Sequence, residues 1–130
     1  MMEKFTIAVA SDDKENLSKQ HFGEAKMYLI YEISKTKLEQ LTIVENRSPE
    51  EKMHGDPNKA KGVAHLLKPF GVKVLINKEF GKNITRMQQK FVVVLGQNLN
   101  IEETIQQIQF QFDSIVEEWK KGEERDYLKI

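Results

Sequence analysis

The 130-residue sequence contains no cysteine. Disulfide bonds and thiolate catalysis are therefore excluded, and no protein thiolate is available to hold zinc or an iron–sulfur cluster. Any metal bound by this sequence must be held by histidine, carboxylate or backbone groups.

An excess of charge and a long apolar run are also missing. Lysine plus arginine and aspartate plus glutamate number 20 each, so the net charge is zero, whereas a nucleic-acid-binding domain is usually basic. No apolar run approaches the roughly 20 residues of a membrane span. The first apolar run begins at Phe5, and no signal-peptide pattern precedes it. We therefore expect a soluble, cytoplasmic protein with no nucleic-acid or membrane partner.

The 39% of hydrophobic residues suffice for one buried core, and their periodicity predicts an α/β fold. Short apolar runs predict five strands, at residues 5–10, 27–33, 38–45, 72–76 and 91–95. Longer periodic segments predict helices at 57–68, 81–89 and 100–121. The order β-β-β-α-β-α-β-α predicts a mixed five-stranded sheet with helices packed on it.

The last predicted helix is the best marked. Asn100 is a suitable N-cap and Gly122 a suitable stop, and between them apolar residues recur every three or four positions. We expect its first half to cover the sheet, in a domain of residues 1–112. Residues 113–130 would then be a C-terminal extension and tail. Its apolar side chains are either further core or a homodimer seam, and we assign the interface to Ile115, Val116 and Trp119.

His21-Phe22-Gly23 is the leading candidate for a site, because it stands between two predicted strands. An imidazole there can bind a metal or a ligand, and glycine permits close approach of the backbone. The alternative is that His21 only closes the loop through a backbone hydrogen bond.

Two further histidines and two glycines are weaker candidates. His54 precedes Gly55 and a helix start, so it is either a ligand or an ordinary loop residue. His65 is expected on the solvated face of that helix. Gly55 and Gly81 each lie beside a predicted helix start, where free backbone N–H groups attract anions.

Asp12 and Asp13 follow the first predicted strand. Paired carboxylates can hold a divalent ion for phosphoryl chemistry, which would make the protein a metal-dependent hydrolase. The alternative is a solvated polar loop.

The order of these motifs resembles the dinitrogenase iron–molybdenum cofactor biosynthesis family, the nitrogenase accessory domains. The matching segments are Ile7–Asp12, His21–Ala25, His54-Gly55, Gly71–Ile76, Phe80–Asn83 and Asn100–Ile105. Together they span roughly residues 5 to 110.

The resemblance implies a ribonuclease-H-like motif, with a five-stranded mixed sheet and helices on both faces. It also implies that His21 and His54 contact an iron–sulfur or iron–molybdenum-type cluster. The expected ligand-binding residues around them are Asp12, Phe22, Gly23, Gly55 and Gly81.

The function expected from this resemblance is that of a non-enzymatic accessory or carrier protein, which binds a metal cluster or another anionic ligand at the strand ends. Its partner would be a protein that donates or accepts the cluster. The alternative is a metal-free interaction module of the same fold, self-associating through the C-terminal helix.

Overall fold

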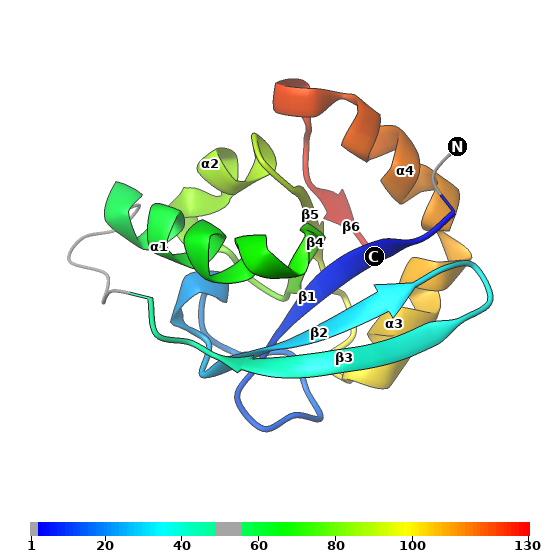
Figure 1. The fold of residues 1–130 in the computed structure, drawn as a ribbon, viewed down its shortest axis with the longest axis horizontal. Coiled ribbons are helices and arrows are strands. Elements are labelled where there is room, and N and C mark those ends of the chain that lie inside the picture. The colour runs from blue at the N-terminus through cyan, green and yellow to red at the C-terminus, as the bar shows by residue number, and fades with distance from the viewer. Residues whose placement is uncertain (1–2, 49–55) are drawn as a thin grey trace.

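A mixed six-stranded sheet forms the centre of the protein (Figure 1). The structure is a computed structural model and describes residues 3–48 and 56–130. The strands are β1 (Phe5–Ser11), β2 (Met27–Ile33), β3 (Leu38–Glu45), β4 (Val72–Asn77), β5 (Val92–Leu95) and β6 (Leu128–Lys129). Their order is β3-β2-β1-β4-β5-β6. Pairing is antiparallel from β3 to β1 and parallel from β1 to β6, so β1 joins the two halves.

The five predicted strands are confirmed, but the predicted count of five is wrong. The sixth strand is only two residues long, and so short a segment has no periodicity from which to predict it. β6 forms because the end of the chain returns to β5, where the Ile130 N–H donates to the Leu95 carbonyl at 3.0 Å. Ile130 is thereby buried. The ribonuclease-H-like motif stays a prediction.

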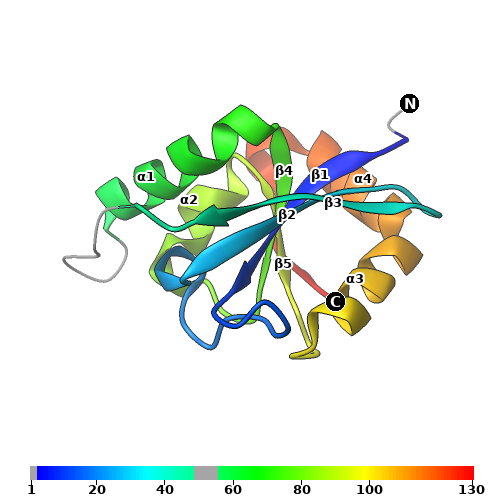
Figure 2. The same ribbon diagram turned by 60° about the horizontal axis from the view of Figure 1, so that its bottom comes forward.

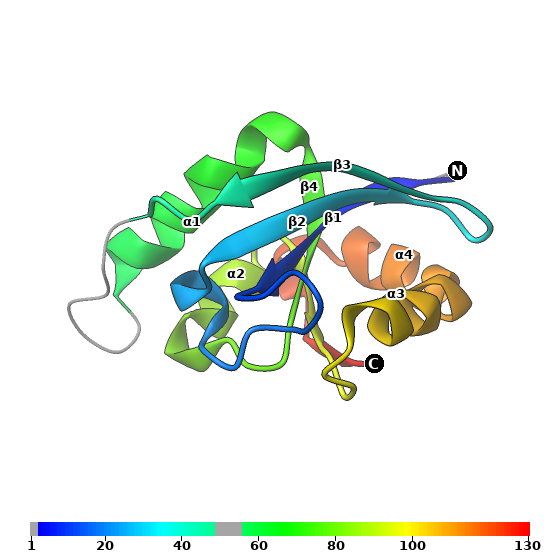
Figure 3. The ribbon, with the colours of Figure 1, turned by 90° about the horizontal axis from the view of Figure 1, so that it is seen from below.

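Helices cover both faces of the sheet, as expected (Figures 2 and 3). Helices α1 (Pro57–Leu67) and α2 (Ile84–Gln88) pack on one face, and α3 (Ile101–Phe110) and α4 (Phe112–Lys120) on the other. β1 is buried on both faces: Ile7 and Val9 contact the α3–α4 side, and Ala8 and Ala10 the α1–α2 side. A central strand is buried in this way when helices cover both faces of the sheet.

The start of α1 follows from its first residues. The Asp56 side chain accepts a hydrogen bond from the Asn58 N–H at 2.9 Å, and Pro57 occupies the first turn. After α1, a short 3₁₀ turn (Lys68–Phe70) leads to Gly71, whose φ of +67° reverses the chain into β4.

The single helix predicted over residues 100–121 is wrong, because the structure divides it at Gln111. The Asn100 cap is confirmed, since its side chain accepts from the Glu103 N–H at 3.0 Å. At the break, Phe112 stacks on Phe5 with ring centroids 4.5 Å apart, whereas Phe110 is 86% exposed. Two helices can therefore each direct an apolar face at the curved sheet. The 3₁₀ turn Gly122–Glu124 then leads towards β6.

The three residues assigned to an interface are not free in this chain. Ile115 and Val116 belong to the core on the α3–α4 side, and Trp119 is partly buried against it. Residues 113–130 therefore add to the same core as residues 1–112. The apolar residues of this segment exceed what a five-stranded sheet would need to cover it. The sequence does not show that the sheet extends to a sixth strand. Self-association stays a prediction, and Trp119 is the one of the three residues that is partly exposed.

Replacing Ile115 distinguishes core from interface. We expect Ile115→Ala to lower the free energy of unfolding by about 3 kcal/mol, because it leaves a cavity in the core. Phe110→Ala, in the neighbouring helix, should change it by less than about 0.5 kcal/mol, because that side chain is exposed. Chemical denaturation of both variants measures the difference. A stable Ile115→Ala protein with altered sedimentation would contradict the assignment to the core.

Candidate functional site

The candidate site lies beyond the carboxyl ends of β1 and β4. These strands are adjacent and parallel, but the chain continues from β1 to β2 on one side and from β4 towards β5 on the other. In open α/β sheets, loops that diverge in this way leave a crevice in which ligands usually bind. The loop after β1 carries His21, and the loop after β4 carries Gly81.

Hydrogen bonds tie the two loops together. The Phe22 N–H donates to the Glu79 carbonyl at 2.9 Å. Beneath them, the fully buried Asn77 at the end of β4 donates from Nδ2 to the carbonyls of Gln20, at 2.8 Å, and Glu79, at 3.1 Å. Asn77 Oδ1 is buried with no hydrogen-bond partner among the described residues. Sequence reasoning missed Asn77, although an asparagine that ends an otherwise apolar strand was the available signal.

His21 and Gly81 are brought into contact. Gly81 has a φ of +70°, and a Cβ atom added there would lie 2.5 Å from His21 Nδ1 and 2.9 Å from its Cε1. The imidazole therefore lies directly against the backbone of Gly81, and its side chain is partly exposed. The helix predicted at 81–89 is only a 3₁₀ turn (Gly81–Asn83) followed by α2, too short to attract an anion. The role of Gly81 is to make room for the ring of His21.

Phe22 acts as an anchor beneath the site. Its ring is fully buried, stacks on Phe80 with centroids 4.9 Å apart, and lies 4.8 Å from the ring of Tyr28. Tyr28 donates its hydroxyl hydrogen to the Phe22 carbonyl at 2.8 Å, and burial raises the pKa of Tyr28. Because the ring of Phe22 is fully enclosed, it offers no surface to a ligand. Phe22 instead holds the loop in place and so positions its neighbour His21.

Gly23 leaves space for a buried lysine. A Cβ atom at Gly23 would lie 3.2 Å from Cε of Lys59, a residue near the start of α1. Lys59 is 3% exposed, and its Nζ lies 3.4 Å from Glu24 Oε1. The Lys59 side chain is 4% exposed and that of Glu24 is 35% exposed, so this ion pair lies at the edge of the interior with its positive charge inside. Sequence reasoning missed Lys59, although it precedes the inward-facing Val63 by one helical turn.

Asp12 and Asp13 both stabilise the loop after β1. Asp12 accepts hydrogen bonds from the Lys26 N–H and the Ser18 hydroxyl, each at 2.9 Å. Asp13 Oδ1 accepts from the N–H groups of Glu15 and Asn16. The bonds from Asn16 and Glu15 lower the pKa of Asp13 to about 2. These bonds give both carboxylates a structural role and weaken the hydrolase interpretation.

The structure places the three histidines differently. His54 and Gly55 lie outside the described residues, so their predicted roles stay predictions. His65 is exposed on α1, as expected. Among residues 3–48 and 56–130, no three histidine or carboxylate side chains are grouped closely enough to hold a metal ion. His21 is thus the single imidazole at the described part of the site.

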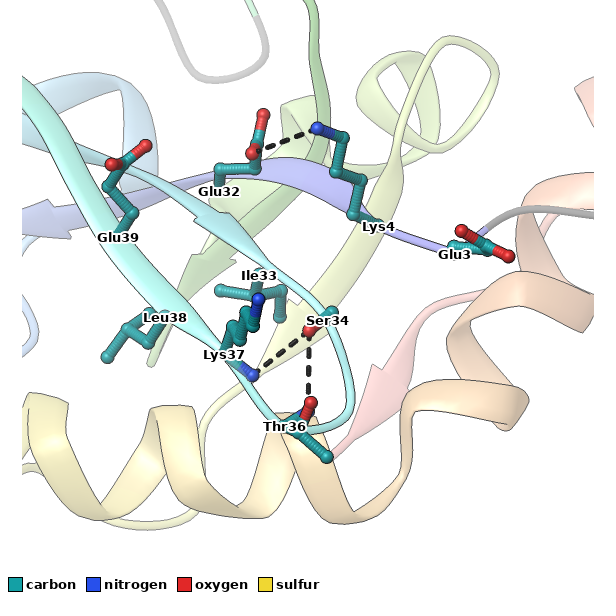
Figure 4. A pocket seen from close by; sticks show the side chains of 9 residues that line it. All are labelled: Glu3, Lys4, Glu32, Ile33, Ser34, Thr36, Lys37, Leu38 and Glu39. Atoms are coloured by element: carbon teal, nitrogen blue, oxygen red, sulfur yellow. Dashed lines mark hydrogen bonds and ion pairs between the residues drawn. The ribbon is translucent and has the colours of Figure 1, made fainter.

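A surface hollow of about 780 Å³ lies elsewhere, beside the turn between β2 and β3 (Figure 4). It contains side chains of both charges, and Lys4 Nζ lies 3.3 Å from Glu32 Oε1. Because it is close to the amino end of β1, it lies far along that strand from His21. No residue predicted for the site lines it.

The contact between His21 and Gly81 can be tested with a matched glycine. Gly71 has a similar positive φ, but nothing lies within 4 Å of an added Cβ. We expect Gly71→Ala to cost about 1 kcal/mol through backbone strain alone. Gly81→Ala should cost about 1 kcal/mol more and shift the His21 ring resonances, because the ring must move.

A double-mutant cycle provides the control. The additional cost of Gly81→Ala should vanish in a His21→Ala background, as measured by denaturant unfolding. An unchanged additional cost in that background would show that the contact is not with His21.

The low pKa of Asp13 predicts a specific dependence of stability on pH. Because the folded-state value of about 2 lies below the ordinary 3.8, this group stabilises the fold above pH 3.8, and that contribution is lost as the pH falls towards 2. Asp13→Asn should therefore show a smaller loss of stability between pH 4 and pH 2. Acid unfolding followed by circular dichroism tests this, and identical pH profiles would contradict it.

Comparisons with known proteins bear on the whole domain. The sequence model of a family described as dinitrogenase iron-molybdenum cofactor matches residues 3–111. The solved NMR structure of a NifB-like protein from Thermotoga is similar, with a TM-score of 0.55 and 21% identity over 85% of this chain and 88% of that one. At this identity, the likeness supports the fold alone.

Two further findings complete the comparison. No curated protein matches the sequence significantly. No helix in the described parts of the chain is both long and apolar enough to cross a membrane. The family match covers most of the sequence, including the loops of His21 and Gly81, and ends next to the predicted boundary at residue 112. This chain belongs to the dinitrogenase iron-molybdenum cofactor family.

Proposed function

We propose that this protein is a non-enzymatic accessory or carrier protein that binds a metal cluster, or another anionic ligand, beyond the carboxyl ends of β1 and β4. The observation that carries the proposal is the position of His21, partly exposed and lying against Gly81 where the two loops diverge. A divergence of this kind is the usual binding place in an open α/β sheet. The family's link to the iron–molybdenum cofactor supports a cluster as the cargo.

The available ligand chemistry suits a cargo that is passed on. The sequence offers no thiolate, and His21 is the one imidazole at the described part of the site. Neutral imidazoles bind iron–sulfur-type clusters less firmly than thiolates, so a cluster held here would be released readily. This property agrees with a protein that receives a cluster from a donor and delivers it to an acceptor. His54, outside the described residues, would be the second ligand.

The polar side chains around the site support a binding role without catalysis. Asp12 and Asp13 accept hydrogen bonds from their own loop, Asn77 holds two carbonyl groups, and Glu24 lies beside Lys59. Each of these groups has a structural use. Within the described part of the site, His21 is the one imidazole, and its side chain is partly exposed.

Anaerobic titration with a cluster donor tests the proposal. We expect the protein to acquire the cluster's absorption bands and to show shifted His21 ring resonances. His21→Ala should bind the cluster roughly tenfold more weakly, because it lacks the contact. His65→Ala is the matched control, since His65 is exposed on α1.

Two results would contradict the proposal. One is an unchanged spectrum and unchanged His21 resonances after exposure to the donor. The other is equal weakening by His21→Ala and His65→Ala, which would indicate non-specific uptake.

A further inference from the structure

A second hollow lies at the opposite end of β4 from His21. Its volume is about 540 Å³. One wall is α1 with the turn at Gly71, the floor is the start of β4 and β5, and the far wall is Trp119 at the end of α4. Figure 3 shows α1 and α4 on either side of β4. We call it the lysine hollow, after its charged lining residues Lys61, Lys68, Lys73 and Lys90.

The four lysines are the only charged side chains that line the lysine hollow. The other lining residues are His65 and apolar residues, and no carboxylate is among them. None of the four lysines forms an ion pair with a carboxylate in the described parts of the chain. In a protein of zero net charge, this is a local concentration of positive potential, which attracts anions.

The walls of the lysine hollow are well supported. Lys61 and His65 are four residues apart on α1, and Lys68 follows three residues later, where α1 passes into the 3₁₀ turn, so the three lie on one side of this segment. The Trp119 ring is covered by Arg125, whose Cζ lies 4.2 Å from the ring centroid, and by Lys73, whose Nζ lies 5.2 Å from it. Arg125 also donates to the Trp119 carbonyl, which fixes the end of α4.

A smaller hollow of about 230 Å³ continues this surface between α1 and α2. It shares Lys61, Lys90 and Phe91 with the lysine hollow, and it too contains no carboxylate side chain. The two hollows therefore adjoin, and basic side chains line both of them.

We propose that the lysine hollow binds a small polyanion, a molecule that carries at least two phosphate or carboxylate groups. The volume falls within the roughly 300–1,000 Å³ of small-molecule sites. A single exposed ion pair contributes little, so an anion with one charge would not be retained, whereas several lysines can engage several charges at once. Because the lysine hollow and His21 lie at opposite ends of β4, this proposal does not depend on the proposed function.

The probe for the test is built into the chain. Trp119 is the only tryptophan, and it lines the hollow. We expect its fluorescence to change saturably with sodium triphosphate or citrate at submillimolar concentration and low salt, and not with acetate. Tighter binding of triphosphate identifies phosphate groups as the ligand chemistry, and tighter binding of citrate identifies carboxylates.

Matched variants distinguish a site from general attraction. Lys68→Gln/Lys90→Gln should weaken triphosphate binding at least tenfold. Lys37→Gln/Lys129→Gln removes the same charge from exposed positions elsewhere and should change it less than twofold. His21→Ala should leave it unchanged, which separates failure of this site from failure of the cluster site.

Three results would overturn the proposal. One is the absence of a saturable change in Trp119 fluorescence up to about 10 mM triphosphate. A dissociation constant of about 1 mM is already weak, so a site that is still empty at ten times that concentration would not bind this ligand usefully. Another is equal weakening in the two double variants. The third is far tighter binding of a single-stranded oligonucleotide than of triphosphate, which would identify a nucleic-acid surface.

Discussion

The parallel pairing of β1 with β4 is the constraint on which the rest of the structure depends. It joins the antiparallel half of the sheet to the parallel half, and it brings together two loops that are far apart in the sequence. The pairing continues past the strands through the bond from the Phe22 N–H to the Glu79 carbonyl and through the Asn77 side chain. Without this registry, His21 would not meet Gly81.

Polar groups in the interior hold loops rather than perform chemistry. Asn77 donates to the carbonyl groups of Gln20 and Glu79, and Tyr28 donates to the Phe22 carbonyl. Buried polar groups are costly unless they are hydrogen-bonded, so these contacts make one arrangement of the loops much more favourable than others. The surface at His21 is therefore shaped before any ligand arrives.

The two ends of β4 differ in chemistry. At the carboxyl end, a single partly exposed imidazole lies against glycine backbone, with the positive charge of Lys59 offset by Glu24. At the amino end, four lysines without an ion-pair partner in the described chain surround a hollow. The first arrangement suits a cluster bound through a metal–nitrogen bond, and the second suits a ligand recognised through its charge. β4 connects the two sites, and its side chains belong to the core clusters on both faces of the sheet.

Local patterns in the sequence determined most of the elements. The strands from Phe5 to Leu95 and the helix capped by Asp56 and Pro57 follow from apolar periodicity and capping, which act over a few residues. The candidate His21 also came from a local pattern. Long-range packing decided the rest: the break at Gln111, the sixth strand and the burial of Ile115 depend on contacts with distant segments such as Phe5 and β5.

The same division applies to the site. Local patterns predict that a histidine and a glycine stand in loops beside strand ends, because strand ends and turns are formed by residues close together in the sequence. Packing between distant segments places His21 against Gly81, lets Asn77 join their loops and buries Lys59 beneath Gly23. It also places lysines from α1, the 3₁₀ turn after it, β4 and the loop before β5 around one hollow. The physical reason is that each contact joins residues whose separation in the chain is bridged by strand pairing and helix packing, which no short sequence pattern encodes.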